Sequence, residues 1–389
     1  MNLYEFVNSR LAQRQAQGRF RRIRDLHMIS STCGYDRQGR RYLLFNTNDY
    51  LGLSHHPLVQ AAARRAVTDG CGAGGSRLLA GAPFILRELE EELADFKGTE
   101  AALLFSTGYM ANVGVLSALP QAGDVIFSDA LNHASIIDGC RMSRARTVVY
   151  AHMDMDDLEK KLQHESGGRR YIVTDGVFSM DGHVCPLPAL VRLKQTYGAV
   201  LLVDDAHGLG VLGKSGRGTA EHFACRDVDI HIGTLSKSLG ALGGYVAASE
   251  AICRYLQNES RPFIFSTALP PAVAAAALTA LRLLRAQGAS YVAQIRDHIA
   301  YMCRQVPTIS QRQPPVPVLP ILTGSSAAAM QYAAACAEAG LQVSAVRPPT
   351  VPEGTARLRI TVTAGHTPDE LRRGADILNE QGEKATWKQ

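Results

Sequence analysis

The chain has 389 residues, of which 46% are hydrophobic and 20% are charged, and its formal net charge is +5. This length exceeds what one hydrophobic core usually serves, and the composition is that of a globular protein, so disordered and collagen-like classes are excluded. The positive charges are scattered apart from the cluster RFRRIR at residues 19–24, so the charge does not indicate nucleic-acid binding.

The predicted elements begin with a helix over the first residues, followed by a hairpin-like stretch, CGYDRQGRRYLLFNTND, at residues 33–49. From about residue 85 to 250, short apolar runs alternate with amphipathic helical stretches, which is typical of largely parallel strands joined by crossover helices. After roughly residue 280 a strand, a helix, further strands and a last helix in TPDELRRGADIL predict a smaller α+β domain. The sequence therefore predicts an α/β protein.

The order of the predicted helices and strands divides the chain into three segments. We predict an N-terminal segment over 1–50, a large α/β domain over 51–275 and a small C-terminal α+β domain over 276–389. The boundary between the two domains is expected in or near the alanine-rich helix that begins at Pro271. The N-terminal segment is too short to fold alone and should pack against the rest of the chain.

The cysteines, the N-terminus and one apolar stretch bear on where the protein acts. The eight cysteines form no C-x-x-C pair and no metal-ligand cluster, which favours reduced thiols in the cytoplasm. The first 22 residues lack a long apolar core and carry Glu5, so no secretory signal is predicted, and their arginines leave a transit peptide as the alternative. The stretch after Ser266 is broken by Pro270, Pro271 and Arg282, so it predicts a helix start rather than a membrane span.

One lysine stands among small residues in GTLSKSLGALGG, at residues 233–244. Lysines are usually solvated surface charges, but small neighbours let backbone and ligand come close to this one. Desolvation would favour the neutral amine of Lys237, which is the nucleophile needed for Schiff-base chemistry with a carbonyl ligand. Lys237 is therefore a candidate catalytic residue, with a surface role as the alternative.

Asp204 and His207 follow a buried strand in AVLLVDDAHGLG, where open parallel sheets place ligand-binding groups. The alternative for the acid is a role in forming the turn. The same stretch contains GLGVLG at residues 208–213, which matches the glycine pattern of dinucleotide-binding proteins. We reject that match, because the following KSGRGTAEH is too rich in glycine and serine to begin the helix that the pattern needs.

Other strand ends also carry polar groups. In LLFSTGYMANVGVLSAL a tight turn leads into a helix, so the backbone N–H groups of Gly108 and Tyr109 could hold a phosphate, or the turn could be a simple connection. TDGVFSMDG offers the Ser179 hydroxyl, and His133 precedes a helical segment that it could instead cap. These groups should converge with Lys237, because the carboxyl ends of parallel strands meet at one edge of a sheet.

The segments DGVFSMDG, VDDAHGLG and TLSKSLGALGG, in this order, resemble the α-oxoamine synthases, a branch of the fold-type I pyridoxal-phosphate enzymes. FNTNDYLGLSHHP, AGGSRLLAG and SAVRPPTVPEGTARLRIT add to a resemblance that covers essentially the whole chain. It implies a large, mostly parallel seven-stranded sheet, pyridoxal 5′-phosphate as cofactor, and a homodimer with shared active sites. It also implies an acyltransferase that condenses an amino acid with an acyl thioester and releases CO2.

The segment RPPTVP narrows the substrates that the resemblance implies. It is similar to the family member that joins L-alanine to pimeloyl-CoA or pimeloyl-acyl-carrier protein in biotin biosynthesis. The alternative is a sister activity with glycine and acetyl-CoA, or with a longer acyl donor. A non-catalytic partner subunit is a further alternative, against which the retention of Lys237, Asp204 and His207 argues.

The resemblance gives the candidate residues roles around the cofactor ring. Lys237 would bind the cofactor's aldehyde covalently, and Asp204 would pair with the ring nitrogen and keep it protonated, so that the ring can withdraw electrons. His133 would stack on the ring. His207 and Ser179 would bond the side of the ring that carries the phenolate oxygen.

The cofactor's phosphate and the substrates would be bound by other residues. Thr234, placed one helical turn before Lys237, would hold the phosphate together with the backbone of Gly108 and Tyr109, and Ser266 or Thr267 would reach the phosphate in the other subunit. Arg347 and Thr350 would bind the alanine carboxylate or the acyl product, because a guanidinium suits a planar carboxylate. An arginine at the pimeloyl site is expected in RFRRIR, where we choose Arg21 with Arg22 as the alternative. Asn48 and His133 complete the predicted substrate contacts.

Overall fold

The computed structural model describes residues 1–310 and 313–384. The chain forms two compact units, which we describe separately. The sheet unit comprises residues 48–179 and 183–294, and the terminal unit comprises residues 1–47, 180–182 and those from 295 onward. The two units separate at 47/48 and, inside helix α12 (Pro271–Gln305), at 294/295. The domain boundaries at 50/51 and 275/276 remain predictions from the sequence.

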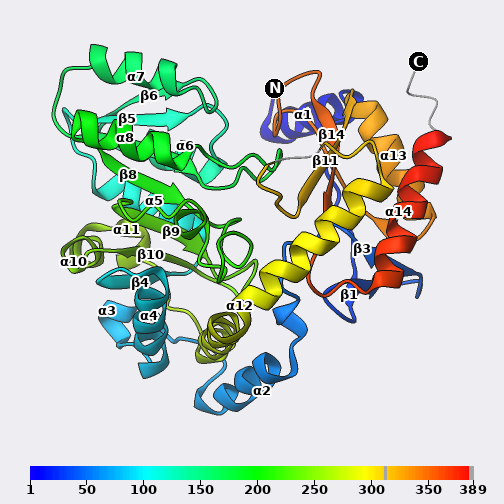
Figure 1. The fold of residues 1–389 in the computed structure, drawn as a ribbon, viewed down its shortest axis with the longest axis horizontal. Coiled ribbons are helices and arrows are strands. Elements are labelled where there is room, and N and C mark those ends of the chain that lie inside the picture. The colour runs from blue at the N-terminus through cyan, green and yellow to red at the C-terminus, as the bar shows by residue number, and fades with distance from the viewer. Residues whose placement is uncertain (311–312, 385–389) are drawn as a thin grey trace. The chain divides into compact units, whose positions relative to one another are not determined.

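A seven-stranded sheet organises the sheet unit (Figure 1). All neighbouring strands are parallel except at β10, which pairs antiparallel with both of its neighbours. The inner strands consist almost wholly of buried residues, as expected for a parallel sheet covered on both faces. The strand order across the sheet is β4 (Ala101–Phe105), β10 (Gly244–Ala248), β9 (Ile230–Thr234), β8 (Val200–Asp204), β7 (Arg170–Asp175), β5 (Val125–Asp129) and β6 (Arg146–Tyr150).

Two hydrophobic cores cover the two faces of this sheet. One core packs α5 (Gly108–Ala118), α6 (Ala134–Met142), α10 (Glu250–Glu259) and α11 (Arg261–Ile264) on the strands. The other packs α7 (Met155–His164) and α8 (Leu187–Tyr197). The shorter and peripheral elements of the unit are η1 (Leu53–His55), α2 (Pro57–Ala66), η2 (Val67–Asp69), α3 (Arg77–Ala80), α4 (Phe84–Lys97) and α9 (Thr219–His222).

The terminal unit contains two small sheets. The first has the order β1 (His27–Met28), β2 (Cys33–Tyr35), β3 (Arg41–Leu44) and β12 (Leu341–Gln342), and the second has β11 (Val318–Gly324), β14 (Ala356–Thr361) and β13 (Ser344–Val346). The predicted hairpin is present as β2 and β3, and β3 also pairs in parallel with β12, so N-terminal and C-terminal residues share one sheet. The helices of this unit are α1 (Leu3–Ala16), the end of α12, α13 (Ser326–Glu338) and α14 (Pro368–Glu383).

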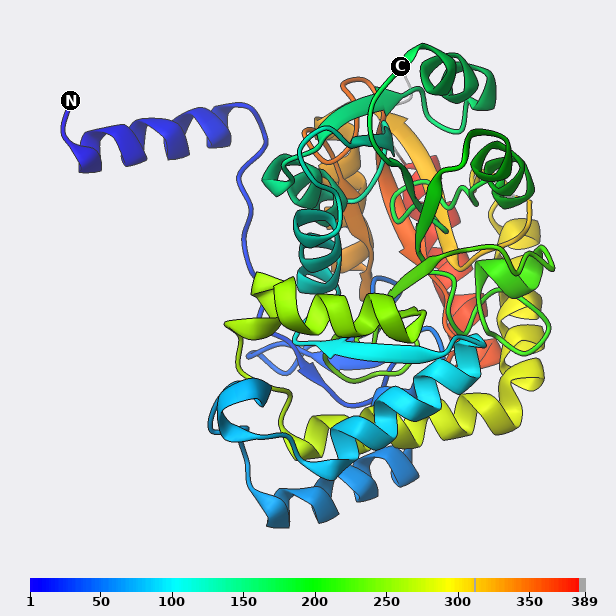
Figure 2. The same ribbon diagram turned by 90° about the vertical axis from the view of Figure 1, so that its left-hand side faces the viewer.

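Local sequence explains where several helices begin. Helix α14 starts at a capping box in which Thr367 and Glu370 satisfy each other's backbone N–H groups, as the predicted TPDE start suggested. Helix α1 also has a capping box, yet it buries none of its residues and stands clear of the strands of its unit (Figure 2). Within residues 1–310 and 313–384, no helix has both the length and the apolar composition needed to cross a membrane.

The fold confirms the predicted class. An α/β protein with a large, mostly parallel seven-stranded sheet and a smaller sheet-containing unit is what the motif order implied. The rejection of GLGVLG is also supported, because residues 208–218 form turns, bends and irregular structure, and the helix that follows, α9, has only four residues.

Candidate active site

The carboxyl ends of three adjacent strands carry the predicted catalytic groups. Strand β8 ends at Asp204 and β9 ends at Thr234, while Ser179, His207 and Lys237 lie in the turns that follow β7, β8 and β9. These residues all belong to the sheet unit. The convergence expected from the strand order is therefore present within one compact unit.

Asp204 is buried and held by neutral donors. Asp204 is the last residue of β8 and is only 5% exposed. Asn112 Nδ2 on α5 donates a hydrogen bond of 2.6 Å to its Oδ2 atom. The backbone N–H of Ala206 donates to Oδ1 over 3.0 Å. Because amide donors orient a carboxylate without neutralising its charge, this acid is suited to pairing with a cationic ring nitrogen.

His133 lies beside this acid as the N-cap of α6. Its Nδ1 atom accepts a hydrogen bond from the Ser135 backbone N–H over 3.2 Å and lies 2.7 Å from Ser135 Oγ. Burial lowers the pKa of His133; the nearby Lys237 charge acts in the same direction, and the Asp204 charge opposes it. A neutral imidazole therefore prevails near pH 7, which suits stacking against a protonated ring.

Asp175, at the end of β7, supports the same corner of the site. It accepts a hydrogen bond of 2.7 Å from the His133 backbone N–H. Burial, followed by the charge of Asp204, raises the pKa of Asp175 well above its usual range, and Lys237 acts in the opposite direction. The lysine, the two acids and the histidine are thus close enough to influence one another.

The start of α5 forms a cradle with the end of β9. Gly108 and Tyr109 are the first two residues of α5, after the N-cap Thr107, so the helix itself offers their N–H groups no carbonyl acceptor. A Cβ atom at Gly108 would lie 3.2 Å from Thr234 Cβ and 3.4 Å from Thr234 Oγ1. Bare N–H groups beside a hydroxyl, with no side chain between them, fit a phosphate group.

The predicted helical spacing between Thr234 and Lys237 is wrong. Thr234 is the last residue of a strand, and Lys237 follows in a turn rather than one helical turn later. Thr234 Oγ1 donates to the Gly243 carbonyl over 2.8 Å and lies 2.7 Å from Ser236 Oγ. These bonds fold residues 234–243 back on themselves, and Gly240 and Gly243 supply the positive φ angles of +60° and +137° that the reversal needs.

His207 is fixed by a residue from a distant part of the sequence. Its Nδ1 atom lies 2.6 Å from the Tyr50 hydroxyl, and Tyr50 is fully buried. The Tyr50 hydroxyl also lies 3.4 Å from Asn48 Oδ1. Asn48, a predicted substrate contact, is thereby joined to the histidine that follows β8.

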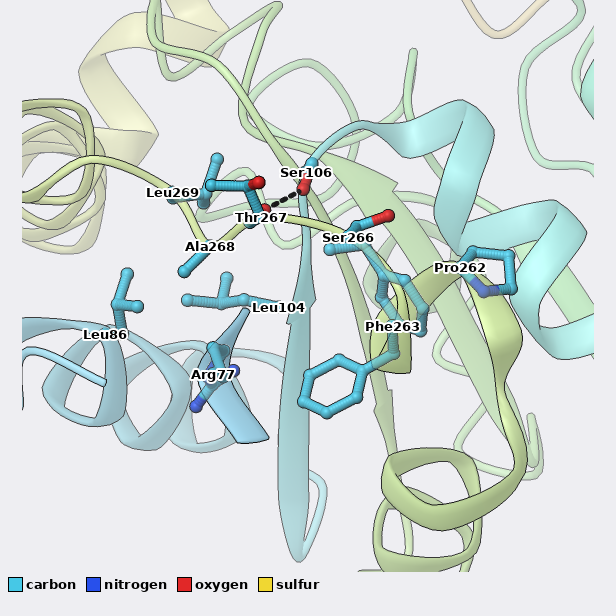
Figure 3. A pocket seen from close by; sticks show the side chains of 11 residues that line it. Arg77, Leu86, Leu104, Ser106, Pro262, Phe263, Ser266, Thr267, Ala268 and Leu269 are labelled. Carbon is cyan, nitrogen blue, oxygen red and sulfur yellow. Dashed lines mark hydrogen bonds between the residues drawn. The ribbon is translucent and has the colours of Figure 1, made fainter. Parts of the chain in front are cut away.

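Ser266 and Thr267 lie near the turn that precedes α5 within the same chain. Ser106 Oγ donates to the Thr267 carbonyl over 2.8 Å, and both residues line a small pocket with Arg77 and Phe263 (Figure 3). The Ser266 hydroxyl lies 3.8 Å from Met110 Sδ on α5. Their expected role at the phosphate of another subunit stays a prediction.

The predicted substrate residues are divided between the two units: Arg21, Arg347 and Thr350 lie in the terminal unit, and Asn48 and His133 lie in the sheet unit. Arg21 Nη2 donates to Thr350 Oγ1 over 3.3 Å, and Arg347 Nη2 donates to the Phe20 carbonyl over 2.7 Å. Burial, followed by the positive charge of Arg21, lowers the pKa of Arg347. Arg22 is placed differently, with its guanidinium 5.8 Å from the Phe20 ring centroid.

Sequence reasoning missed several residues that support the site, namely Tyr50, Asn112, Ser135 and Asp175. Asn112 is the one with a usable signal, because it is a polar residue within the otherwise apolar helix sequence GYMANVGVLSA. A buried amide in such a helix must find hydrogen-bond partners, and here it finds Asp204 and Ser135.

The mostly parallel seven-stranded sheet, with Asp204 and Lys237 at the carboxyl ends of its strands, is the fold of the fold-type I pyridoxal-phosphate transferases. The family model for class I and II aminotransferases matches residues 40–378. Two 8-amino-7-oxononanoate synthases are each 47% identical to this chain. The match to the synthase from Citrifermentans bemidjiense covers 95% of this chain and 96% of that protein. The match to the synthase from Geobacter sulfurreducens covers 97% of this chain and 98% of that protein.

Solved structures show the same relationship. A serine palmitoyltransferase from S. paucimobilis with bound PLP superposes with a TM-score of 0.93, at 31% identity and 99% coverage of both chains. An 8-amino-7-oxononanoate synthase from Francisella tularensis gives a TM-score of 0.75, at 30% identity, covering 88% of this chain and 98% of its own. The chain belongs to the class I and II aminotransferase family, in its α-oxoamine synthase branch, and its cofactor is pyridoxal 5′-phosphate.

Proposed function

We propose that this protein condenses L-alanine with a pimeloyl thioester, of coenzyme A or an acyl-carrier protein, to give 8-amino-7-oxononanoate, CO2 and the free thiol for biotin biosynthesis. The observation that carries the proposal is the grouping of Lys237, Asp204 and His133 at one sheet edge. This grouping occurs in a chain that is 47% identical, over nearly its full length, to synthases of that name. We propose the cytoplasm as its location, which the eight free cysteines support.

The residues at the sheet edge fit the cofactor, and different residues would contact its ring nitrogen, its ring face and its phosphate. Bound pyridoxal phosphate supplies an electron sink that stabilises negative charge at the amino acid Cα. Asp204 holds a proton at the ring nitrogen by charge pairing, and Asn112 fixes the direction of that carboxylate. His133, whose pKa burial lowers, would lie against the ring, and the N–H groups at the start of α5 would bind the phosphate together with Thr234.

Lys237 has two tasks in this proposal. Its amine would hold the cofactor's aldehyde in the resting enzyme and would be free once the substrate's amine has taken its place. The released amine then removes the Cα proton of alanine, acting as general base. Once the alanine Cα has bonded to the thioester carbon with loss of the thiol, and the alanine carboxylate has left as CO2, the same amine would return a proton to Cα.

Arg21, Arg347 and Thr350 are proposed to bind the carboxylates of the substrates. The two guanidinium groups are close enough that the Arg21 charge lowers the pKa of Arg347, so an anionic ligand beside them would relieve their repulsion. The partial burial of Arg347 adds to this preference, because a partly desolvated cation gains more from a charge-assisted hydrogen bond. We assign the far carboxylate of the pimeloyl group to Arg21.

Arg21→Leu is expected to raise KM for pimeloyl-CoA by about 10- to 100-fold, because one charge-assisted hydrogen bond is lost, while kcat changes less than about threefold. Arg22→Leu is the matched control, since its side chain lies over Phe20 and should leave both constants near the wild-type values. Steady-state kinetics with the thioester varied measures both constants. A larger effect in the Arg22 variant would reverse the assignment.

The proposed reaction is tested by identifying the product. We expect incubation of the holoenzyme with alanine and pimeloyl-CoA to give a compound with the mass of 8-amino-7-oxononanoate. A panel with glycine or serine, and with acetyl-CoA or palmitoyl-CoA, tests the sister activities, which the similarity to serine palmitoyltransferase brings into consideration. If the enzyme turned over only one of those combinations of amino acid and thioester, the proposed substrates would be refuted, but the decarboxylative condensation would still stand.

A homodimer is proposed from the exposed apolar side chains of the sheet unit. Phe84 at the start of α4 is 95% exposed, Leu79 in α3 is 92% exposed, and Phe265 after α11 is 70% exposed. Large apolar side chains that are this exposed are typical of a surface that another protein covers. A second copy of the chain is the occupant that the proposed shared active site requires.

Phe84→Glu is expected to shift the protein from dimer to monomer, because a charge would replace a large apolar contact at the interface. Val149→Glu is the control: Val149 is 54% exposed but lies on β6, at the opposite edge of the sheet from β4, against which α4 packs. Light scattering coupled to size-exclusion chromatography measures the mass. The proposal fails if the wild-type protein itself has the mass of one chain.

A further inference from the structure

A buried ion pair lies directly behind the site. Lys97, the last residue of α4, places Nζ 2.9 Å from Oδ2 of Asp205, and their side chains are only 2% and 1% exposed. Lys97 Nζ also donates to the carbonyl of Arg217 over 2.7 Å. Two charges so fully removed from water are costly unless each satisfies the other, so this pair is closely matched.

The surroundings of Asp205 are shaped to hold its carboxylate. Thr219 donates to Asp205 Oδ1 twice, from its hydroxyl over 2.6 Å and from its backbone N–H over 3.1 Å. A Cβ atom at Gly208 or Gly218 would collide with the same carboxylate. The absence of side chains at these glycines lets the backbone close around the acid.

The pair is connected to the residues that face the cofactor. Asp205 follows Asp204 in the chain, and its backbone N–H donates to the Ile232 carbonyl of β9 over 2.8 Å. Its carbonyl accepts hydrogen bonds of 3.0 Å each from the N–H groups of Gly208 and Leu209. Anchoring the Asp205 side chain therefore fixes the whole turn that presents Asp204 and His207.

Lys97 also sets the charge behind the site. Three buried titratable side chains that interact with the pair are kept uncharged near neutral pH, namely Cys185, Tyr245 and His231. Burial, followed by the charge of Asp205, raises the pKa values of Cys185 and Tyr245 well above their usual ranges. Burial, followed by the charge of Lys97, lowers the pKa of His231. Compensation of the Asp205 charge therefore falls to Lys97.

We propose that Lys97 is a positioning residue for this active site. Through Asp205, it holds the turn that carries Asp204 and His207, and its cation cancels a second buried carboxylate that would otherwise add negative charge behind Asp204. The inference rests on the proposed function in one respect, namely that Asp204 and His207 face the cofactor. It assigns a catalytic consequence to a lysine that touches neither substrate nor cofactor.

Lys97→Met tests the proposal, with two measurements on the full-length protein. The dissociation constant for pyridoxal phosphate is expected to rise at least about tenfold, because the turn loses its anchor. In a spectrophotometric pH titration of the holoprotein, the pKa of the bound cofactor is expected to rise by about one unit, because the uncompensated Asp205 anion favours protonated forms.

Lys194→Met is the matched control. Lys194 is a largely buried lysine of the same unit, and its Nζ lies 2.9 Å from Asp229, which precedes β9 at the other end of the sheet. This variant should lower the melting temperature and leave cofactor affinity and the titration unchanged. The double variant Lys97→Met/Asp205→Asn removes both charges and should return the cofactor's titration to the wild-type pH, even if Lys97→Met alone folds poorly.

The proposal is overturned if Lys97→Met titrates like the wild-type protein, or if the double variant keeps the shift. These results differ from a failure of the proposed function, in which the wild-type protein would neither bind pyridoxal phosphate on Lys237 nor form the expected product.

Discussion

Lys237→Ala is expected to lower kcat by at least about 10⁴-fold, because one amine serves both as the tether of the cofactor and as the general base. The folded variant should still bind pyridoxal phosphate noncovalently, since Asp204 and the cradle formed by Gly108 and Thr234 are unchanged. Single-turnover kinetics with alanine and pimeloyl-CoA measures the rate, and absorbance after dialysis measures the bound cofactor.

Lys214→Ala provides the control for this variant. Lys214 is exposed, lies in the same unit and follows the turns after β8, so its loss should leave kcat and cofactor binding unchanged. Turnover by Lys237→Ala within about tenfold of the wild-type rate would mean that another group removes the Cα proton. The role of Lys237 would then have to be abandoned.

Asp204→Asn is expected to lower kcat by about 10³-fold while preserving the shape of the side chain. The amide cannot hold a proton at the ring nitrogen by charge, so the ring withdraws electrons less strongly from Cα. The phosphate cradle is untouched, and the affinity for pyridoxal phosphate should therefore fall much less than kcat. Steady-state kinetics and equilibrium titration of the apoprotein separate the two effects.

Asp229→Asn controls for the loss of a carboxylate from the same sheet. Asp229 accepts a hydrogen bond of 2.7 Å from the Leu201 backbone N–H and pairs with Lys194, away from the carboxyl ends of the strands. Its replacement should reduce stability and leave kcat near the wild-type value. If Asp204→Asn retained kcat within about threefold of wild type, the charge at the ring nitrogen would not matter for this reaction.

The positions of the catalytic groups could be predicted because strand ends are encoded locally. A run such as VLLVD predicts a buried strand followed by an acid, and several such runs in one parallel sheet must deliver their polar residues to the same edge. Asp204 is predicted in this way, whereas Lys237 is predicted from its small neighbours and Thr234 from the resemblance to the α-oxoamine synthases. The prediction of a helical path between Thr234 and Lys237 is wrong, because the path depends on the hydrogen bonds that Thr234 makes with Gly243 and Ser236 rather than on residue spacing.

Supporting contacts were beyond sequence reasoning because they join residues far apart in the chain. Asn112 and Asp204 are separated by 92 positions, and Tyr50 and His207 by 157. Which residue of α5 meets the end of β8 depends on how the helix packs on the sheet, which no local pattern records. The role of Lys97 was also beyond sequence reasoning. A lysine in the last turn of a helix usually lies in solvent and interacts favourably with the helix dipole, so its position alone does not indicate a buried ion pair.

The attachment of the cofactor to Lys237 is the central claim, and reduction with borohydride tests it most directly. The purified holoprotein would be reduced, digested and analysed by mass spectrometry for the peptide that carries a pyridoxyl group. The account predicts a single stable pyridoxyl adduct on Lys237. An adduct on a different lysine, or none in a protein that has bound its cofactor, would contradict it.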